Sequence, residues 1–234
     1  MYEYRGLQDV FFLMLYGGVT FFALLACLYL LLRRGNTFVG EEIKSSRVLR
    51  RWTAALMAAI AASHMWWYFI GVYWLADDWL VRTIIVIMLD YATLVPLAMA
   101  VLLAMLQDCR RPLWPWLVAQ LPVVAFAIVG IAQRSAFWGR ELPYYWQLAV
   151  IVAFVTYYIY ALRCYGRWLL DNYADLDRKE VWQSLVFVLA LLAVYALYTS
   201  NAGELMREYL SQVISIVIIA FLLWRVETLQ ELEE

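Results

Sequence analysis

Seven apolar runs dominate the sequence, and each approaches the length of about 20 residues that a helix needs to cross the hydrocarbon of a bilayer. The runs cover residues 10–32, 53–76, 84–106, 114–132, 146–165, 184–200 and 210–224. The last two are short, but aromatic and polar flanks such as Trp182, Gln183 and Tyr209 extend them into the interface. A backbone in lipid must satisfy its hydrogen bonds within its own segment, so we expect all seven runs to be helices.

The composition leads to the same conclusion. Hydrophobic residues make up 66% of the 234 residues and charged residues 16%, whereas soluble domains are about half apolar and a quarter charged. A water-soluble fold of this size could not bury so much apolar surface. We therefore expect an all-α integral membrane protein, with residues 1–226 forming a bundle of seven transmembrane helices whose partner is the lipid bilayer.

The placement of basic residues predicts the orientation of this bundle. Most of the 18 lie in the odd-numbered connections and the tail, namely Arg33, Arg34, Lys44, Arg47, Arg50, Arg51, Arg110, Arg111, Arg163, Arg167, Arg178, Lys179 and Arg225. The N-terminus and the even-numbered connections hold only Arg5, Arg82, Arg134, Arg140 and Arg207. Because positive charge is retained on the cytoplasmic side, we expect the N-terminus outside and the C-terminus in the cytoplasm.

Residues suited to catalysis or to cofactor binding are scarce. A nucleophile needs a base and an orienting group, and the sole candidate base, His64, adjoins a Ser63 that points to another face of the helix. A single histidine excludes a multi-histidine metal site, and no phosphate-binding loop is present. Lys44 and Lys179 lie in connections, so no lysine is available for a retinal Schiff base. We expect no enzyme activity, no cofactor and three free cysteines.

Two ionisable residues lie well inside the predicted spans, His64 in the second and Asp90 in the third. Such residues are costly in hydrocarbon and usually mark a site. Their depths agree within about one helical turn, so we expect a hydrogen bond between them. One interpretation is an interhelical clasp. The other is a ligand contact or protonation switch, since imidazole titrates near neutral pH.

Further polar and aromatic residues gather in the outer halves of the spans and could line a pocket for an unknown small ligand. They are Trp66, Trp67, Tyr68, Tyr91, Gln147, Tyr195, Tyr198, Thr199, Asn201, Gln212 and Ser215. With His64 and Asp90, we take Trp67, Tyr91, Gln147, Tyr195 and Gln212 as the candidate ligand or switch residues. The alternative is that the aromatic residues belong to an interfacial belt.

Two further features concern the course of the helices. Pro96 and Pro122 lie inside predicted spans, and we expect them to kink the third and fourth helices. The tail, residues 225–234, is predicted to continue the seventh helix into water, with Val226, Leu229 and Leu232 as a thin apolar stripe after Arg225. This tail is either a frayed end or the start of a helical linker that carries a signal to the cytoplasm.

Two short segments carry a family resemblance. Residues 169–182 read Leu-Leu-Asp-Asn-Tyr-Ala-Asp-Leu-Asp-Arg-Lys-Glu-Val-Trp, and residues 224–234 read Trp-Arg-Val-Glu-Thr-Leu-Gln-Glu-Leu-Glu-Glu. They resemble the N-terminal membrane region of Bacteroidota membrane-anchored transcription regulators with an AraC-type helix-turn-helix domain. In that family a similar loop precedes the penultimate helix, and a similar tail leads into the DNA-binding domain. The sequence given has no helix-turn-helix pattern or basic DNA-reading face, so we expect no direct nucleic-acid contact by this segment.

Three functions remain open. The resemblance implies a signal-sensing domain in a bacterial inner membrane, relaying an outer-side or intramembrane signal to a cytoplasmic output, a transcription regulator absent from this chain through truncation or loss. The alternative is a small-molecule or ion transporter that uses the region of His64 and Asp90, and the third reading is a scaffold without a ligand. A homodimer is one assembly open to such a domain.

Overall fold

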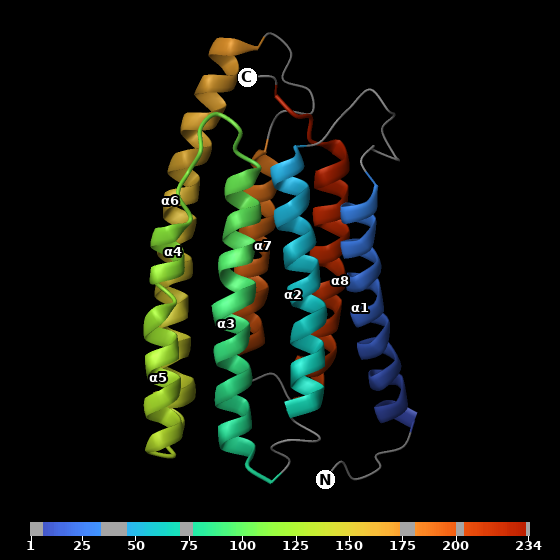
Figure 1. Ribbon diagram of the computed structural model, residues 1–234, viewed down its shortest axis with the longest axis vertical. Coiled ribbons are helices and arrows are strands. Elements are labelled where there is room, and N and C mark those ends of the chain that lie inside the picture. Colours follow the sequence, from blue (N-terminus) through green and yellow to red (C-terminus); the bar gives the residue numbers. More distant parts are fainter. Residues whose placement is uncertain (1–6, 34–45, 71–76, 174–180, 200–203, 233–234) are drawn as a thin grey trace.

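The computed structural model describes residues 7–33, 46–70, 77–173, 181–199 and 204–232, with backbone alone at 7–9, 191–199 and 204–208. These residues form seven helical rods and no strand. Figure 1 shows how the rods are arranged side by side. The rods are α1 (Leu7–Leu32), α2 (Arg47–Phe69), α3 (Trp79–Ala104), α4 with α5 (Trp114–Val118 and Leu121–Ala132), the π-helical turn η2 with α6 (Phe137–Glu141 and Leu142–Asn172), α7 (Trp182–Thr199) and α8 (Glu204–Thr228). The all-helical prediction is confirmed.

Five of the described rods are long and apolar enough to cross a membrane. They are Val10–Leu32, Trp79–Ala104, Trp114–Ala132, Phe137–Asn172 and Tyr209–Thr228. The helix α2 is more polar, since it begins with Arg47, Arg50 and Arg51, and the second half of α7 is described by its backbone alone. The chain is therefore a membrane protein by its helices, while the full number of crossings and their direction stay predictions.

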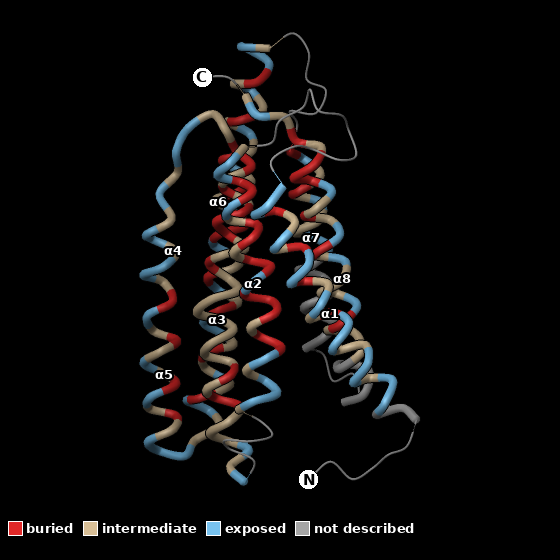
Figure 2. Tube along the Cα trace, turned by 45° about the vertical axis from the view of Figure 1, so that its right-hand side comes forward, coloured by how far each residue is buried: buried red, intermediate tan, exposed pale blue. Residues whose placement is uncertain are grey.

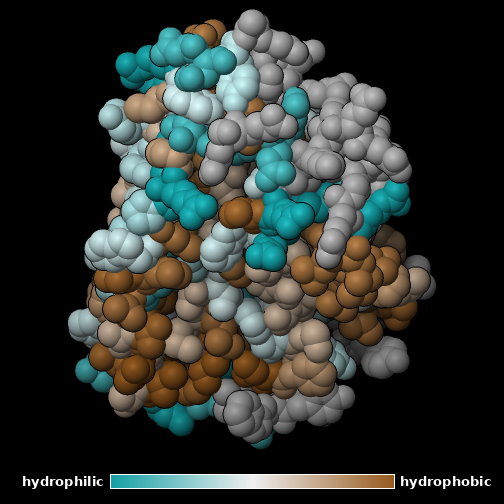
Figure 3. Space-filling model, turned by 45° about the horizontal axis from the view of Figure 1, so that its top comes forward, coloured by the Kyte–Doolittle hydropathy of each residue, from teal (hydrophilic) through white to brown (hydrophobic). Residues whose placement is uncertain are grey.

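The outer surface of the bundle is strongly apolar, as expected of a protein surrounded by lipid. Helix α1 alone exposes Phe11, Leu13, Met14, Phe21, Leu24, Leu25, Leu28, Leu31 and Leu32. In Figure 3 hydrophilic side chains gather at the end where α8 terminates, and hydrophobic ones cover the flank below them. A soluble monomer rarely exposes so large an apolar patch.

The core is one cluster of buried apolar side chains to which α1, α2, α3, α6 and α8 contribute. Figure 2 shows the buried positions turned inward on these helices, with the rod of α4 and α5 at one edge. Lipid tails are as apolar as leucine, so close packing and interhelical hydrogen bonds, rather than exclusion of water, hold such helices together. Polar contacts between helices therefore matter most for locating a site.

The two prolines have different effects. Helix α3 runs unbroken through the buried Pro96, whereas the fourth rod is interrupted at Ala119 and Gln120, just before Pro122. A proline lacks the N–H that would continue the helical hydrogen bonds. Next to the proline, the N–H of Val123 bonds the carbonyl of Gln120 rather than that of Ala119. The carbonyl oxygen of Ala119 accepts a hydrogen bond from the indole of Trp146 on α6 instead, at 2.8 Å. The predicted distortion at Pro122 is thus a break that a neighbouring helix satisfies.

Helix α5, the turn η2 and helix α3 meet at two glycines. A Cβ placed on Gly130 of α5 would lie 2.4 Å from the Cα of Gly139 in η2, and one placed on Gly139 would lie 2.2 Å from Cδ1 of Ile84 on α3. Small residues allow the backbones of membrane helices to approach this closely. The two glycines therefore fix the edge rods against α3, which carries Asp90.

Candidate functional site

Asp90 of α3 is the acceptor for three donors from α2. Its Oδ1 accepts from the Ser63 hydroxyl at 2.7 Å and from the Trp66 indole at 3.0 Å. Its Oδ2 accepts from the Trp67 indole at 2.8 Å. Ser63, Trp66 and Trp67 are three and four positions apart, which places them on one face of α2. The carboxylate therefore joins α2 to α3 through one serine and two tryptophans, and not through His64.

His64 makes its contacts with other elements. Its Nδ1 lies 2.8 Å from the carbonyl oxygen of Ile60, and its Nε2 lies 2.9 Å from Oε1 of Gln212 on α8. The Tyr16 hydroxyl of α1 donates to the backbone carbonyl of His64, and the two rings are 4.6 Å apart at their centroids. The histidine thus connects α2 to α1 and α8.

The predicted hydrogen bond between His64 and Asp90 is wrong. The depths were compatible, but Ser63 and His64 are consecutive residues of one helix, so their side chains diverge by about 100° around its axis. Ser63 faces α3 and reaches Asp90, while His64 faces α8 and reaches Gln212. Matching depth alone does not determine which neighbouring helix a side chain meets.

The contact between His64 and Gln212 is compatible with two protonation states. The Ile60 carbonyl can only accept, so Nδ1 carries a hydrogen. With the amide oxygen of Gln212 facing Nε2, the contact fits an imidazolium, which donates from both ring nitrogens. A half-turn of the amide presents its N–H to a neutral imidazole instead. Either state leaves the buried pair with a hydrogen bond.

A cavity of about 200 Å³ lies beside His64, between α2, α3, α7 and α8. Its wall is mainly apolar and includes Leu56, Leu94, Val101, Phe187, Ile218 and Leu222. The polar groups on the wall come from Ser63, His64 and Ser215. An apolar cavity with a few polar groups is typical of a small-molecule site.

The remaining residues that were predicted to line a pocket lie at different places in the structure. Gln212 bonds His64 and Trp67 bonds Asp90. Tyr91 is half-buried on α3 and is not part of the cavity wall. Gln147 is fully buried on α6, where neither atom of its amide has a hydrogen-bond partner among the described residues. The side chain of Tyr195, like those of Tyr198, Thr199 and Asn201, lies outside the described residues.

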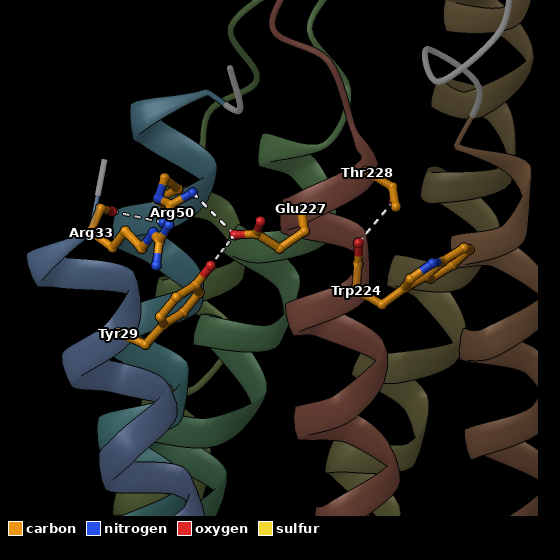
Figure 4. Close-up of polar contacts among 6 residues, drawn as sticks. All are labelled: Tyr29, Arg33, Arg50, Trp224, Glu227 and Thr228. Atoms are coloured by element: carbon orange, nitrogen blue, oxygen red, sulfur yellow. Dashed lines mark hydrogen bonds and ion pairs between the residues drawn. The ribbon is translucent and has the colours of Figure 1, made fainter. Parts of the chain in front are cut away.

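A second polar cluster lies at the end of the bundle where α8 terminates (Figure 4). Oε1 of Glu227 accepts a hydrogen bond from the Tyr29 hydroxyl at 2.8 Å and lies 3.5 Å from Nη1 of Arg50. Nη2 of Arg50 donates to the backbone carbonyl of Arg33 at 2.8 Å. Arg50 is 6% exposed and Glu227 1% exposed. This ion pair therefore joins the ends of α1, α2 and α8 away from water.

The predicted helical linker does not extend into water. Helix α8 ends at Thr228, and Val226 and Leu229 are fully buried. The Gln107 side chain, in the connection after α3, donates to the carbonyl of Gln230 at 3.0 Å and accepts from the N–H of Leu232 at 2.9 Å. The apolar stripe that was expected to face water is thus turned toward the bundle. The end of the bundle offers it apolar contacts, and the amide of Gln107 bonds its backbone.

Arg225, predicted as part of the signal output, also faces the bundle. It is 3% exposed, and its Nη1 donates to Oε1 of Gln183 at the start of α7, at 2.9 Å. Leu232 is half-buried. The four predicted output residues therefore belong to a docked segment, which we call the C-terminal segment, residues 225–232.

Several residues of both clusters were not predicted from the sequence. Tyr16, Tyr29 and Gln107 carried no signal, because a single tyrosine or glutamine near a span end is ordinary. Arg50 and Glu227 were detectable in principle, since opposite charges beside apolar runs predicted to end on the same side invite pairing. Among the described residues, no group of three or more histidines, cysteines or acids could hold a metal ion.

No protein-family model, curated protein or solved structure matches this chain. The resemblance to the membrane region of AraC-type regulators therefore stays a prediction.

Proposed function

We propose that this chain is a membrane sensor domain, in which a change at the cavity beside His64 alters how the C-terminal segment is held. In this proposal the seven rods all cross the membrane, with the N-terminus outside. The cytoplasmic output then receives the signal from the end of α8. A transcription regulator would be such an output, by the resemblance of the tail.

The observation that carries this proposal is the position of α8. Its Gln212 bonds His64, and its Ser215, Ile218 and Leu222 belong to the cavity wall. Further along the same helix, Glu227 pairs with Arg50 and Tyr29. At a rise of 1.5 Å per residue, Gln212 and Glu227 are about 22 Å apart. One helix thus contacts both the cavity and the cluster of Tyr29, Arg50 and Glu227. A shift of α8 at the cavity would therefore move its other end, and we call this coupling the relay.

Charge supports the proposed direction. The described residues at the end where α8 terminates include Arg33, Arg47, Arg50, Arg51 and Arg110, whereas the opposite end has Arg82, Arg134 and Arg140. The excess of arginine favours the cytoplasm for the first end. The C-terminal segment would then lie where a cytoplasmic partner can reach it.

The test is hydrogen–deuterium exchange on the full chain in lipid nanodiscs, followed at the amide of Leu232, which donates to Gln107. Gln212→Leu keeps the size of the side chain and removes its contact with His64. If α8 couples the two clusters, exchange at residues 229–232 should rise by about fivefold, the equivalent of about 1 kcal/mol for one hydrogen bond.

The matched control is Gln147→Leu, the same change at a buried glutamine on α6 whose amide bonds no residue in the described part of the chain. We expect this variant to leave exchange at residues 229–232 as in the wild type. Equal exchange in Gln212→Leu and the wild type would contradict the relay. Saturable solute flux in proteoliposomes, lost with His64→Leu, would favour the transporter instead.

A further inference from the structure

We infer that the cavity between α2, α3, α7 and α8 binds a small, neutral, mainly apolar molecule that donates one hydrogen bond to its serine end. This inference rests on the proposed function, since it names the class of molecule that the sensor would detect. It is carried by the size of the cavity, by its wall and by the hydrogen bonds that its polar groups already make.

The volume of the cavity limits the size of the ligand. The cavity measures about 200 Å³, and an apolar protein cavity of roughly 150 Å³ is known to hold benzene. A ligand of about ten non-hydrogen atoms therefore fits. A whole lipid, a peptide or a nucleotide exceeds this volume.

The apolar wall of the cavity disfavours a charged ligand. Leu56, Val101, Phe187, Ile218 and Leu222 offer no partner for an ion, and an unpaired charge in such surroundings is strongly unfavourable. The Asp90 carboxylate, bonded to Ser63 behind the wall, adds repulsion against an anion. With a neutral imidazole at His64, whose Nε2 accepts from the Gln212 amide, a neutral molecule is the class that remains.

The existing hydrogen bonds determine the polarity of the contact. Ser63 donates its hydroxyl hydrogen to Asp90 at 2.7 Å. Ser215 donates its own to the backbone carbonyl of Ser211 at 2.9 Å. Each hydroxyl has one hydrogen and two acceptor lone pairs, so what these serines offer the cavity is acceptors. The complementary ligand group is a donor such as a hydroxyl or N–H.

His64 adds neither a free donor nor a free acceptor to the cavity. Both of its ring nitrogens are engaged, Nδ1 with the carbonyl of Ile60 and Nε2 with Gln212. The ring therefore contributes its flat face and edge to the wall. A planar ligand beside it gains aromatic contact.

The probes are 4-propylphenol and 4-propyltoluene, which have the same shape and differ by a hydroxyl in place of a methyl group. Binding is measured by equilibrium dialysis of nanodiscs that contain the full chain, with empty nanodiscs of the same lipid subtracted. We expect saturable binding of the phenol, with an affinity about 3- to 10-fold above that of the hydrocarbon, as one hydrogen bond predicts.

Two pairs of variants locate the site. Ala98→Phe fills the cavity wall and should abolish binding, whereas Ala153→Phe, at an exposed position of α6, should not. Ser215→Ala should remove most of the phenol's advantage over the hydrocarbon. Its control, Thr156→Ala, deletes a hydroxyl that makes the same bond to its own helix on α6 and should leave both affinities unchanged.

The outcomes separate this inference from the relay. Equal binding of the two probes, or unchanged binding in Ala98→Phe, overturns the ligand class even if Gln212→Leu still alters exchange at residues 229–232. Phenol binding that Ala98→Phe abolishes supports the cavity site. If that binding leaves the exchange of the Leu232 amide unchanged, the site stands and the relay is wrong.

Discussion

The carboxylate of Glu227 lies 3.5 Å from the guanidinium of Arg50, and the two side chains are 2% and 7% exposed. Glu227 belongs to α8 and Arg50 to α2 (Figure 4), so an ion pair shielded from water joins the last helix to the second. Breaking such a pair by removing one partner is costly, because the other charge stays buried. Its replacement by well-packed apolar groups often costs little.

Glu227→Gln should therefore destabilise the protein more than its small change in shape implies. The amide can still accept from Tyr29, but the charge beside Arg50 is lost. We expect the free energy of unfolding to fall by about 3 kcal/mol, measured by SDS titration of the purified chain. The control, Glu231→Gln, changes an exposed acid in the same segment and should stay within about 0.5 kcal/mol of the wild type.

The double variant Arg50→Met with Glu227→Leu tests the same pair from the other side. With both charges removed, no ion stays buried, and the double variant should be more stable than Glu227→Gln alone. A single variant as stable as the wild type would show that the charge pair contributes nothing.

Asp90→Asn should weaken the contact between α2 and α3. An asparagine can accept from Ser63 and Trp66 with its oxygen, but its NH₂ group then faces the indole N–H of Trp67, and two donors oppose each other. We expect a loss of about 1–3 kcal/mol in the free energy of unfolding. In this background Trp67→Phe should cost less than it does in the wild type, and a double-mutant cycle measures the difference. Additive losses would contradict the contact.

The fold was predictable because lipid imposes simple rules. Apolar length and the need to satisfy the backbone gave the helices, although the structure extends several of them. The rod predicted over 146–165 begins with η2 at Phe137 and ends at Asn172. Polar and charged residues such as Arg163 and Asp171 prolong a helix beyond the apolar run, and hydropathy does not register this extension.

The partners within the site were less predictable. His64 and Asp90 were recognisable as rare polar residues in apolar runs, but their contacts depend on the rotation of α2 about its axis, which hydropathy does not determine. The C-terminal segment was misread for a related reason. Val226 and Leu229 form an apolar face whose partner, the end of the bundle, is assembled from residues distant in the sequence.

Gly130→Ala should disrupt the contact between α5 and η2. The added Cβ would lie 2.4 Å from the Cα of Gly139, and backbone on both sides cannot yield as a side chain can. We expect a loss of about 2–3 kcal/mol, at the upper end for overpacking, measured as a fall in the unfolding midpoint. Gly17→Ala is the control, since beyond its own helix backbone and chain neighbours no atom of the described residues lies within 4 Å of its added Cβ, and alanine favours a helix by about 1 kcal/mol. Equal midpoints in the two variants would contradict the close approach.

The native cysteines test the proposed direction of the bundle. Cys109 is exposed in the connection after α3, whereas Cys27 and Cys164 are half-buried. A membrane-impermeant maleimide should label Cys109 only after the cells are permeabilised, if this end faces the cytoplasm. Arg134→Cys, in a variant without Cys109, places the thiol at the opposite end, where the Arg134 side chain is 75% exposed. The reverse labelling pattern would invert the orientation and remove the cytoplasmic output.

Gln107→Leu should loosen the end of the C-terminal segment, residues 230–232, without unfolding the bundle. The glutamine amide pairs with both the carbonyl of Gln230 and the N–H of Leu232, and leucine can do neither. We expect exchange of the Leu232 amide to rise by about five- to tenfold, as the loss of one or two hydrogen bonds predicts, while the amides of α3 exchange as before.

The same variant separates docking of the segment from the ion pair. Leu229 is fully buried within the segment, so its contacts should hold the chain near the bundle even when the amide is lost. Exposure of the whole segment to protease should then require Glu227→Gln together with Gln107→Leu. If Gln107→Leu alone makes residues 225–232 fully accessible, the ion pair of Glu227 and Arg50 does not restrain the end of α8. The cluster around this pair then cannot be the element that a sensor would release.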